Sequence, residues 1–261
     1  MGRPLADHLI ARGAGGRKLL VPYLTGGIPT AEDFPGALAA LAPHADSLEV
    51  GLPYSDPLMD GPVISSASEQ ALAAGVGPLR ALQLSATVSG VPRVAMTYYN
   101  PVHRVGERAF CQRAAAAGFA GLIVPDLPLE ESASLRSHAA DEGLGWVPLV
   151  APTTPIGRVA ALADTATGFV YGVSTLGVTG ARDSLSERAG LVAAACKEAT
   201  DLPVLVGIGV STPQQARSAV RMADGVIVGS AIVRLAVEQG VGAATRLAAQ
   251  MRNALDEAGR K

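Results

Sequence analysis

Eight short runs of mostly apolar, often β-branched residues recur along the chain, and they are the strongest constraint on its fold. Alanine-rich stretches with helical spacing separate them. Each run is apolar almost throughout, which is typical of strands covered on both faces in a parallel sheet. The predicted strands are 19–24, 46–50, 93–99, 120–126, 145–150, 168–173, 203–209 and 224–230.

Eight strand–helix units within 261 residues predict an α/β protein with the architecture of a (β/α)8 TIM barrel, in which domains of about 250 residues are typical. No linker or low-complexity segment divides the chain, so we expect a single domain over 1–261, with an extra N-terminal helix. A doubly wound open sheet is the alternative. The most clearly delimited helices are predicted at 31–41, 62–74, 78–88, 129–142 and 213–222.

Composition excludes several classes of protein. Hydrophobic residues make up 49% of the chain and charged residues 17%, which is incompatible with a disordered chain. A net charge of −2 and 4% aromatic residues argue against nucleic-acid binding. No apolar run approaches the ~20 residues of a membrane span, and the first residues lack the apolar region of a secretory signal. We therefore expect a soluble, cytoplasmic protein without nucleic-acid or membrane partners.

The ends of the last two predicted strands have the composition of a phosphate-binding site. Active sites of TIM barrels lie at the C-terminal ends of the strands. Gly209 follows one strand, and Gly229 and Ser230 open the helix after the next. Glycine lets an anion approach the backbone, and free N–H groups at a helix start attract it. We expect phosphate binding there by backbone groups without a side-chain cation; the alternative is that these glycines only form tight turns.

Two carboxylates near the second strand are candidates for acid–base chemistry. Glu49 alternates with the apolar residues of its strand, so it should project into the mouth of the barrel, where burial would raise its pKa. Alternatively it bends out to solvent or pairs with an arginine. The loop 51–62 that follows is dense in proline, glycine and acid, and Asp56 and Asp60 both lie in it. Asp-Pro and Asp-Gly pairs also form ordinary turns.

The loop after the sixth predicted strand, 172–184, has the composition of a mobile lid. It is rich in glycine, serine and threonine, and such loops often close over a bound substrate. Gly177 and Gly180 would act as hinges, and Thr179 would bring a hydroxyl group to the site. The alternative is a disordered surface loop.

Missing residue types exclude several kinds of chemistry. The chain has three lysines, Lys18, Lys197 and Lys261, and none falls at the C-terminal end of a predicted strand, which disfavours an imine-forming aldolase. No HExxH, CxxC or carboxylate–histidine cluster indicates a metal site, and no Walker A or GxGxxG motif indicates a nucleotide. We therefore predict carboxylate acid–base chemistry on a phosphorylated small molecule, without a metal.

Six motifs in this chain resemble those of the tryptophan synthase alpha chain family, in the same order and over nearly the whole length. The strand-two motif is the most specific, whereas the GxG and GS pairs are shared with other phosphate-binding barrels. The motifs are LEVGLPYSDPLMDGP (48–62), MTYYNP (96–101), LIVPDLPLEE (122–131), GVTGAR (177–182), VGIGVSTPQQA (206–216) and VGSAIV (228–233).

The resemblance implies a (β/α)8 lyase of tryptophan biosynthesis. Such an enzyme cleaves indole-3-glycerol phosphate to indole and D-glyceraldehyde 3-phosphate by a retro-aldol reaction, without a metal or a cofactor in this chain. It also implies a partner, the pyridoxal-phosphate-containing beta chain, in an alpha2beta2 heterotetramer. The beta chain would receive the indole through a tunnel and condense it with serine.

The resemblance also implies roles for individual residues. Glu49 would act as the catalytic acid and base, and Asp60 would pair with the indole N–H, supported by Tyr171 and Thr179 when the lid closes. The residues implied to bind substrate are Tyr23, Tyr98, Tyr171, Thr179 and Ile208. Those implied to bind phosphate are Gly180, Gly209, Gly229 and Ser230. Those implied to face the partner are Pro53 and Asp56.

The chain departs from the family pattern at three places. After the first strand it has Gly27-Ile28 before Pro29 where many members have Gly-Asp-Pro, and before GVTG it has Ser174-Thr175-Leu176 where many have Ser-Arg-Ala. Ile208 stands where many members have phenylalanine. We expect the first change to alter the contacts of its loop and the second to alter lid closure or the pairing of the lid with the partner. Another phosphate-binding barrel isomerase or metal-free aldolase, or a non-catalytic activating subunit, remain the alternative functions.

Overall fold

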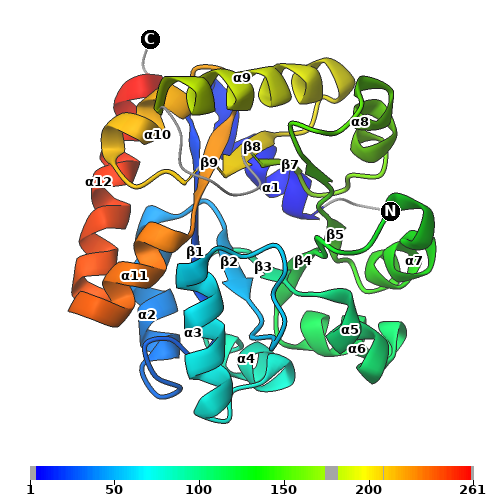
Figure 1. Cartoon of the computed structure of the whole chain (residues 1–261), viewed down its shortest axis with the longest axis vertical. Coiled ribbons are helices and arrows are strands. Elements are labelled where there is room, and N and C mark those ends of the chain that lie inside the picture. Colours follow the sequence, from blue (N-terminus) through cyan, green and yellow to red (C-terminus); the bar gives the residue numbers. More distant parts are fainter. Residues whose placement is uncertain (1–3, 174–181, 208, 260–261) are drawn as a thin grey trace.

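A computed structural model describes residues 4–173, 182–207 and 209–259 of the protein. A ring of short strands forms its centre, and helices surround the ring (Figure 1). Every pair of neighbouring strands is parallel. The strands are β1 Leu19–Thr25, β2 Leu48–Gly51, β3 Arg93–Met96, β4 Phe119–Ile123, β5 Gly145–Trp146, β6 Leu149–Val150, β7 Val170–Val173, β8 Val204–Gly207 and β9 Gly225–Val228.

The sheet closes on itself, which confirms the predicted TIM barrel and excludes the open sheet. Its order is β5-β4-β3-β2-β1-β9-β8-β7-β6, so its two end strands are consecutive in the chain. Between them, the Val147 amide donates to Leu122 at 3.0 Å, and the Pro148 carbonyl accepts from Tyr171 at 3.0 Å. The predicted fifth strand is therefore interrupted at Pro148, which has no N–H to donate. Its two halves pair with opposite neighbours.

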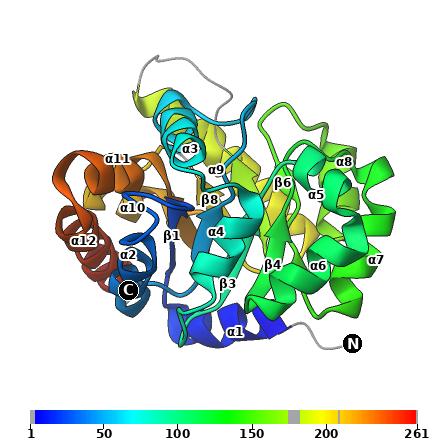
Figure 2. The same ribbon diagram turned by 90° about the horizontal axis from the view of Figure 1, so that it is seen from below.

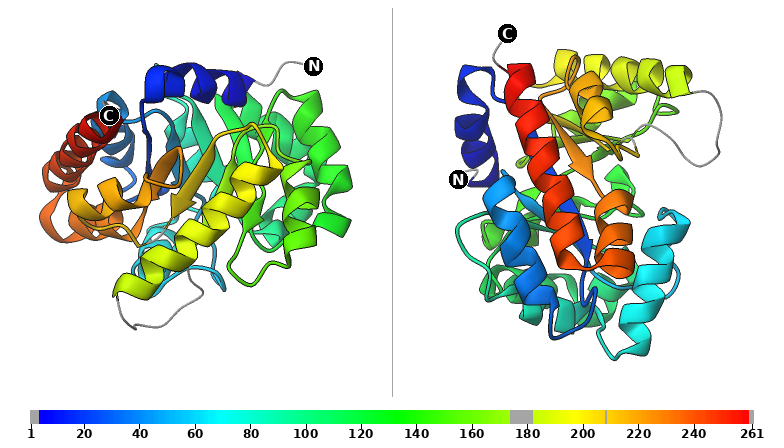
Figure 3. Two further views of the ribbon diagram at one scale, coloured as in Figure 1. Left: turned by 90° about the horizontal axis from the view of Figure 1, so that it is seen from above. Right: turned by 90° about the vertical axis from the view of Figure 1, so that its left-hand side faces the viewer.

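The helices fill the connections between strands, as expected. They are α1 Pro4–Gly13, α2 Phe34–Leu41, α3 Pro62–Ala73, α4 Pro78–Ser85, α5 Tyr99–Val105, α6 Glu107–Ala116, α7 Ala133–Asp141, α8 Ile156–Ala163, α9 Arg182–Ala199, α10 Pro213–Ala219, α11 Ser230–Gln239 and α12 Val241–Gly259. Along the outside of the barrel, α12 packs against α2, α10 and α11 (Figure 3). Within the described ranges, none of the helices is long and apolar enough to cross a membrane.

Several helix ends follow from local sequence. At α10, Thr212 accepts from the Gln215 amide and the Gln215 side chain bonds back to Thr212, a complete capping box. At α2, the predicted start was too early, because Thr30 and Asp33 hydrogen-bond to each other in a turn and the helix begins at Phe34. The predicted helix over 129–142 is a 3-10 turn followed by α7.

The additional N-terminal helix closes one end of the barrel (Figure 2). Leu5 and Leu9 of α1 are fully buried and pack with the side chains that fill the barrel interior. Glycines near the starts of three strands make room for Leu5, since a Cβ added at Gly121 or Gly168 would lie 2.7 or 2.8 Å from its Cδ2 atom. In the described part of the chain, the open end of the barrel is therefore the one where the strands have their C-termini.

A buried ion-pair network fastens the closed end of the barrel. The carboxylate of Asp46 is fully buried and accepts from the Leu20 amide at 2.9 Å and from Arg252 of α12 at 2.8 Å. Arg12 of α1 and Arg17 donate to the same carboxylate. One side chain thus joins α1, the first two strands and α12.

We expect Asp46→Ala to lower the free energy of unfolding by about 3–5 kcal/mol, because it removes the fully buried carboxylate that pairs with Arg252 and leaves that guanidinium only the partly exposed Asp256 as an ion-pair partner. Urea denaturation followed by circular dichroism measures the change. Glu257→Ala is the control: its pair with Arg217 is 2.8 Å long, but both side chains are about half exposed, so the cost should stay below about 1 kcal/mol. Equal losses in the two variants would contradict a structural role for the network.

Candidate active site

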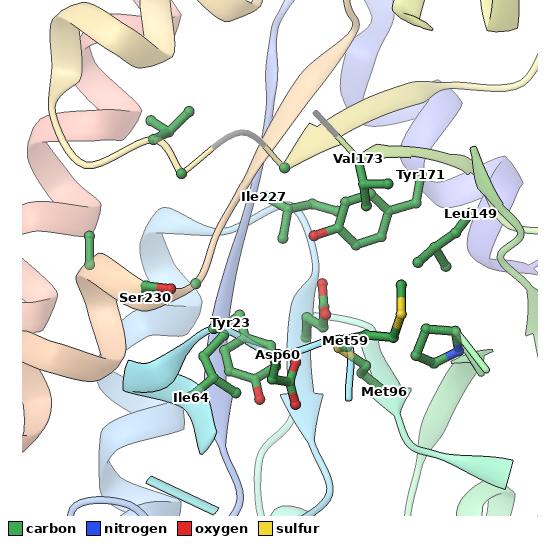
Figure 4. A pocket seen from close by; sticks show the side chains of 18 of the residues that line it. Tyr23, Met59, Asp60, Ile64, Met96, Leu149, Tyr171, Val173, Ile227 and Ser230 are labelled. Carbon is green, nitrogen blue, oxygen red and sulfur yellow. The ribbon is translucent and has the colours of Figure 1, made fainter. Parts of the chain in front are cut away.

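The C-terminal ends of the strands open into a cavity of about 420 Å3. Residues from β1, β2, β3, β6, β7, β8 and β9 line it, together with the loop after β2 and the start of α11. Figure 4 shows Tyr23 and Asp60 together on one side of this cavity, with Tyr171 and Leu149 across from them. The cavity is the place where the barrel fold leads us to expect an active site.

Glu49 projects from β2 into the cavity, as the alternation of its strand predicted. It lies opposite Tyr23 in the register of β1 and β2 and is 1% exposed. Its neighbours Leu48 and Val50 face the other way, into the core between strands and helices. Among the described residues, its Oε2 atom has no hydrogen-bond partner. An unpartnered, buried carboxyl group is costly for folding alone, which points to a functional use.

Burial raises the pKa of Glu49 to about 8, and the nearby charge of Asp60 adds to the rise. A carboxyl group loses its hydration when it is buried, so its charged form is disfavoured. At neutral pH, Glu49 is therefore mostly a protonated carboxylic acid. It is able to give a proton to a substrate and to take one back, because its pKa lies close to the working pH.

Asp60 comes from the loop after β2 and lines the same cavity. The Asp60 amide donates to the Pro57 carbonyl at 3.0 Å, which fixes the turn that aims its side chain inward. Burial raises the pKa of Asp60 to about 6, and the Tyr98 hydroxyl partly offsets the rise. The pKa values of the two carboxyl groups are thus different. At pH 7, Glu49 is mostly a protonated acid and Asp60 is mostly a carboxylate, which is the pattern of an acid–base pair.

Of the three tyrosines predicted to contact substrate, Tyr23 and Tyr171 line the cavity. Burial raises the pKa of both, so their hydroxyls stay neutral. Tyr98 does not line it. Its hydroxyl accepts from the Met59 amide at 3.0 Å, and its ring stacks on Tyr54 at 5.2 Å. Tyr98 therefore holds the loop that carries Asp60, and its contact with substrate stays a prediction.

The predicted phosphate-binding residues after β8 and β9 also meet at the cavity. Gly209 has a φ of 60°, a conformation that favours glycine. Gly229 is the N-cap of α11 and supplies no side chain to the first amides of the helix, so these N–H groups are free to bind an anion. The backbone geometry is compatible with a bound phosphate.

Three predicted residues lie outside the described residues: Thr179, Gly180 and Ile208. The same applies to most of the predicted lid and to the departure at Ser174-Thr175-Leu176. Of the two residues predicted to face a partner, Asp56 is exposed, whereas Pro53 is buried near Gly26.

Arg234 was missed by the sequence interpretation. It lines the cavity, and among the described lining residues it alone has a positively charged side chain. The interpretation took candidates only from the first residues after each strand, and Arg234 lies four residues beyond Ser230, inside α11. Helical spacing from Ser230 was the signal that could have identified it.

Within the described ranges, no group of three or more histidine, cysteine, aspartate or glutamate side chains could hold a metal ion. Two of the three lysines also lie away from the cavity. Lys18 donates to the Ala223 carbonyl, and Lys197 pairs with Asp224, beside the start of β9. Lys261 is outside the described residues. The cavity therefore contains no described amine that could form an imine with a substrate.

A closed parallel barrel with two carboxyl groups of raised pKa in a cavity at its open end is the arrangement of a TIM-barrel enzyme. The family model for the tryptophan synthase alpha chain matches residues 10–258. This protein belongs to the tryptophan synthase alpha chain family.

Individual relatives match over most of their length and of this chain. The tryptophan synthase alpha chain of Synechococcus elongatus is 44% identical, with 97% of each chain covered. That of Streptomyces avermitilis is 44% identical over 91% of this chain and 87% of its own length. A chain in a solved structure of Mycobacterium tuberculosis tryptophan synthase is 39% identical with a TM-score of 0.91, covering 98% of this chain and 99% of that one. The alpha subunit from Legionella pneumophila is 32% identical with a TM-score of 0.87.

Proposed function

We propose that this protein is a lyase that cleaves indole-3-glycerol phosphate to indole and D-glyceraldehyde 3-phosphate, as the alpha subunit of tryptophan synthase in L-tryptophan biosynthesis. The observation that carries the proposal is Glu49, a protonated, fully buried carboxyl group beside Asp60 in the cavity. Membership of the family supports the choice of substrate. The proposed reaction uses no cofactor bound to this chain.

Glu49 and Asp60 suffice for a balanced reaction. Protonated Glu49 gives its proton to C3 of the indole ring, which creates a positive charge at the ring nitrogen. The Asp60 carboxylate stabilises that charge by accepting a hydrogen bond from the indole N–H group. The Glu49 carboxylate then takes the proton of the hydroxyl group on the glycerol carbon that is attached to C3. The C–C bond breaks, its electrons restore the ring, and the hydroxyl oxygen becomes the aldehyde oxygen of the product.

The rest of the cavity positions the substrate. Tyr23, Ile64 and Leu149 provide apolar surface for an indole ring. Gly209, Gly229 and Ser230 would hold the phosphate through backbone amides and one hydroxyl, with Gly180 contributing from the lid. This arrangement sets the distance from the phosphate to the reacting carbon.

We also propose that the protein works with a beta chain that contains pyridoxal phosphate, in an alpha2beta2 assembly in the cytoplasm. The loop that carries Asp60 supports a docking role, because Asp56 is exposed and the adjacent Leu58 and Met59 are 80% and 42% exposed. A partner bound to this loop would order it together with the lid. The partner would thereby raise the population of competent enzyme without adding a catalytic group.

The test is release of indole from indole-3-glycerol phosphate by the purified chain, with and without a beta chain. We expect slow release by the chain alone and faster single-turnover cleavage once complex formation is established by sedimentation. A chain that forms the complex but releases no indole under either condition would contradict the proposed activity. An equal rate in both conditions would overturn the loop-ordering role of the partner.

A negative charge at the start of α11 should interfere with phosphate binding. We expect Gly229→Asp to raise KM for indole-3-glycerol phosphate by about tenfold or more, because a carboxylate would lie where the phosphate dianion binds. The free helix N-terminus would also be neutralised. Steady-state kinetics measure the effect, with Gly242→Asp on α12 as the control for net charge. An unchanged KM would place the phosphate elsewhere.

A further inference from the structure

Arg234 is a cation at the edge of the cavity that the proposed backbone cradle does not use. It lines the active-site cavity and also the shallow groove between α3 and α11. Its side chain is exposed. Within the part of the chain that the structure describes, it forms no ion pair, whereas Arg158, Arg217 and Arg252 each do.

The position of Arg234 on α11 directs it toward the anion site. Residues four apart lie on the same face of an α-helix, so Arg234 shares a face with Ser230. Helical side chains lean toward the N-terminus and cover the turn before their own Cα atom. A long arginine side chain at this position is therefore able to reach back over the first turn of α11, which begins directly after Gly229.

The charges of the cavity make a cation useful here. Among the described residues that line it, Asp60 is the one that carries a negative charge at neutral pH, since Glu49 is mostly protonated. The Asp60 carboxylate opposes the binding of a phosphorylated substrate. Backbone amides and a helix dipole provide only partial positive charge. A guanidinium group provides a full charge and two parallel N–H donors that match phosphate oxygens.

We infer that Arg234 binds the phosphate group of the substrate and thereby selects phosphorylated over unphosphorylated indole-glycerol compounds. The inference rests on the proposed function and adds a side-chain cation to its backbone cradle. It differs from the expectation, based on sequence, that no side-chain cation takes part. Arg234 acts far from the reacting carbon, so its contribution is to binding and not to the chemical step.

The test uses three variants of the full chain. Arg234→Gln should raise KM for indole-3-glycerol phosphate about five- to tenfold and leave kcat within about twofold, since the lost interaction is exposed and partly screened by salt. Arg234→Lys should recover part of the loss, because it keeps the charge but not the paired donors. Arg246→Gln on α12 is the matched control, since it removes the same charge from an exposed arginine outside the cavity.

Calorimetric binding of glycerol 3-phosphate separates this inference from the proposed function, because it requires no turnover. Weaker binding in Arg234→Gln, with normal binding in Arg246→Gln, supports the inference even if the wild type releases no indole. Equal binding of glycerol 3-phosphate by the wild type and Arg234→Gln overturns it even if indole release is normal. A loss confined to kcat also overturns it.

Discussion

Glu49→Gln should reduce the rate of indole formation by about 10²–10⁴, the range that general acid–base groups contribute, or about 3–5 kcal/mol of the activation barrier. The amide fills the same buried space but has no proton to give to C3 of the indole ring. Single-turnover cleavage of indole-3-glycerol phosphate, with product indole measured directly, provides the rate. Binding of glycerol 3-phosphate should be unchanged, which shows that the cavity is intact.

The pKa values add a pH dependence to this prediction. Glu49 must begin protonated and Asp60 ionised. Because their pKa values are about 8 and about 6, this combination is most populated between those two values. We expect kcat/KM to fall above pH 8 as Glu49 loses its proton, and below pH 6 as Asp60 gains one. Glu49→Gln activity within about threefold of wild type, or a flat profile from pH 5 to 9, would refute the assignment.

Asp60→Asn should cost about 10²–10³ in kcat, as removal of one preorganised charge-stabilising group does in other enzymes. The neutral amide of asparagine accepts a hydrogen bond from the indole N–H group, but it cannot offset the positive charge that develops on the ring when C3 is protonated. Single-turnover kinetics of the isolated chain at saturating substrate measure the loss. The acidic limb of the pH profile should disappear in the same variant.

Asp56→Asn is the matched control for Asp60→Asn, since both aspartates lie in the loop after β2 but only Asp60 lines the cavity. The control should leave cleavage by the isolated chain unchanged and weaken only the response to a beta chain. Equal losses in both variants, measured without the beta chain, would mean that the loop and not the Asp60 carboxylate is responsible.

Local sequence determined the elements of this protein and the direction of several side chains. The apolar runs marked the strands because a buried parallel strand needs apolar residues on both faces. The period of two along β2 placed Glu49 on the face opposite Leu48 and Val50. Thr212 and Gln215 marked the start of α10 as a capping box. These features depend on residues within a few positions of one another, so the chain alone carries them.

Only the tertiary structure decided which distant residues meet. The closed ring depends on β5 and β6 pairing with opposite neighbours around Pro148. The Asp46–Arg252 pair, 2.8 Å long, joins residues that are 206 positions apart. The raised pKa of Glu49 depends on its burial and on Asp60 from the following loop. Arg234 lies in a helix whose sequence is ordinary for a barrel exterior, and only the packing of α11 at the open end exposes it to the cavity. The periodicity of the sequence indicates on which face of a strand or helix a side chain lies. Which of these faces contact one another depends on how the strands and helices pack.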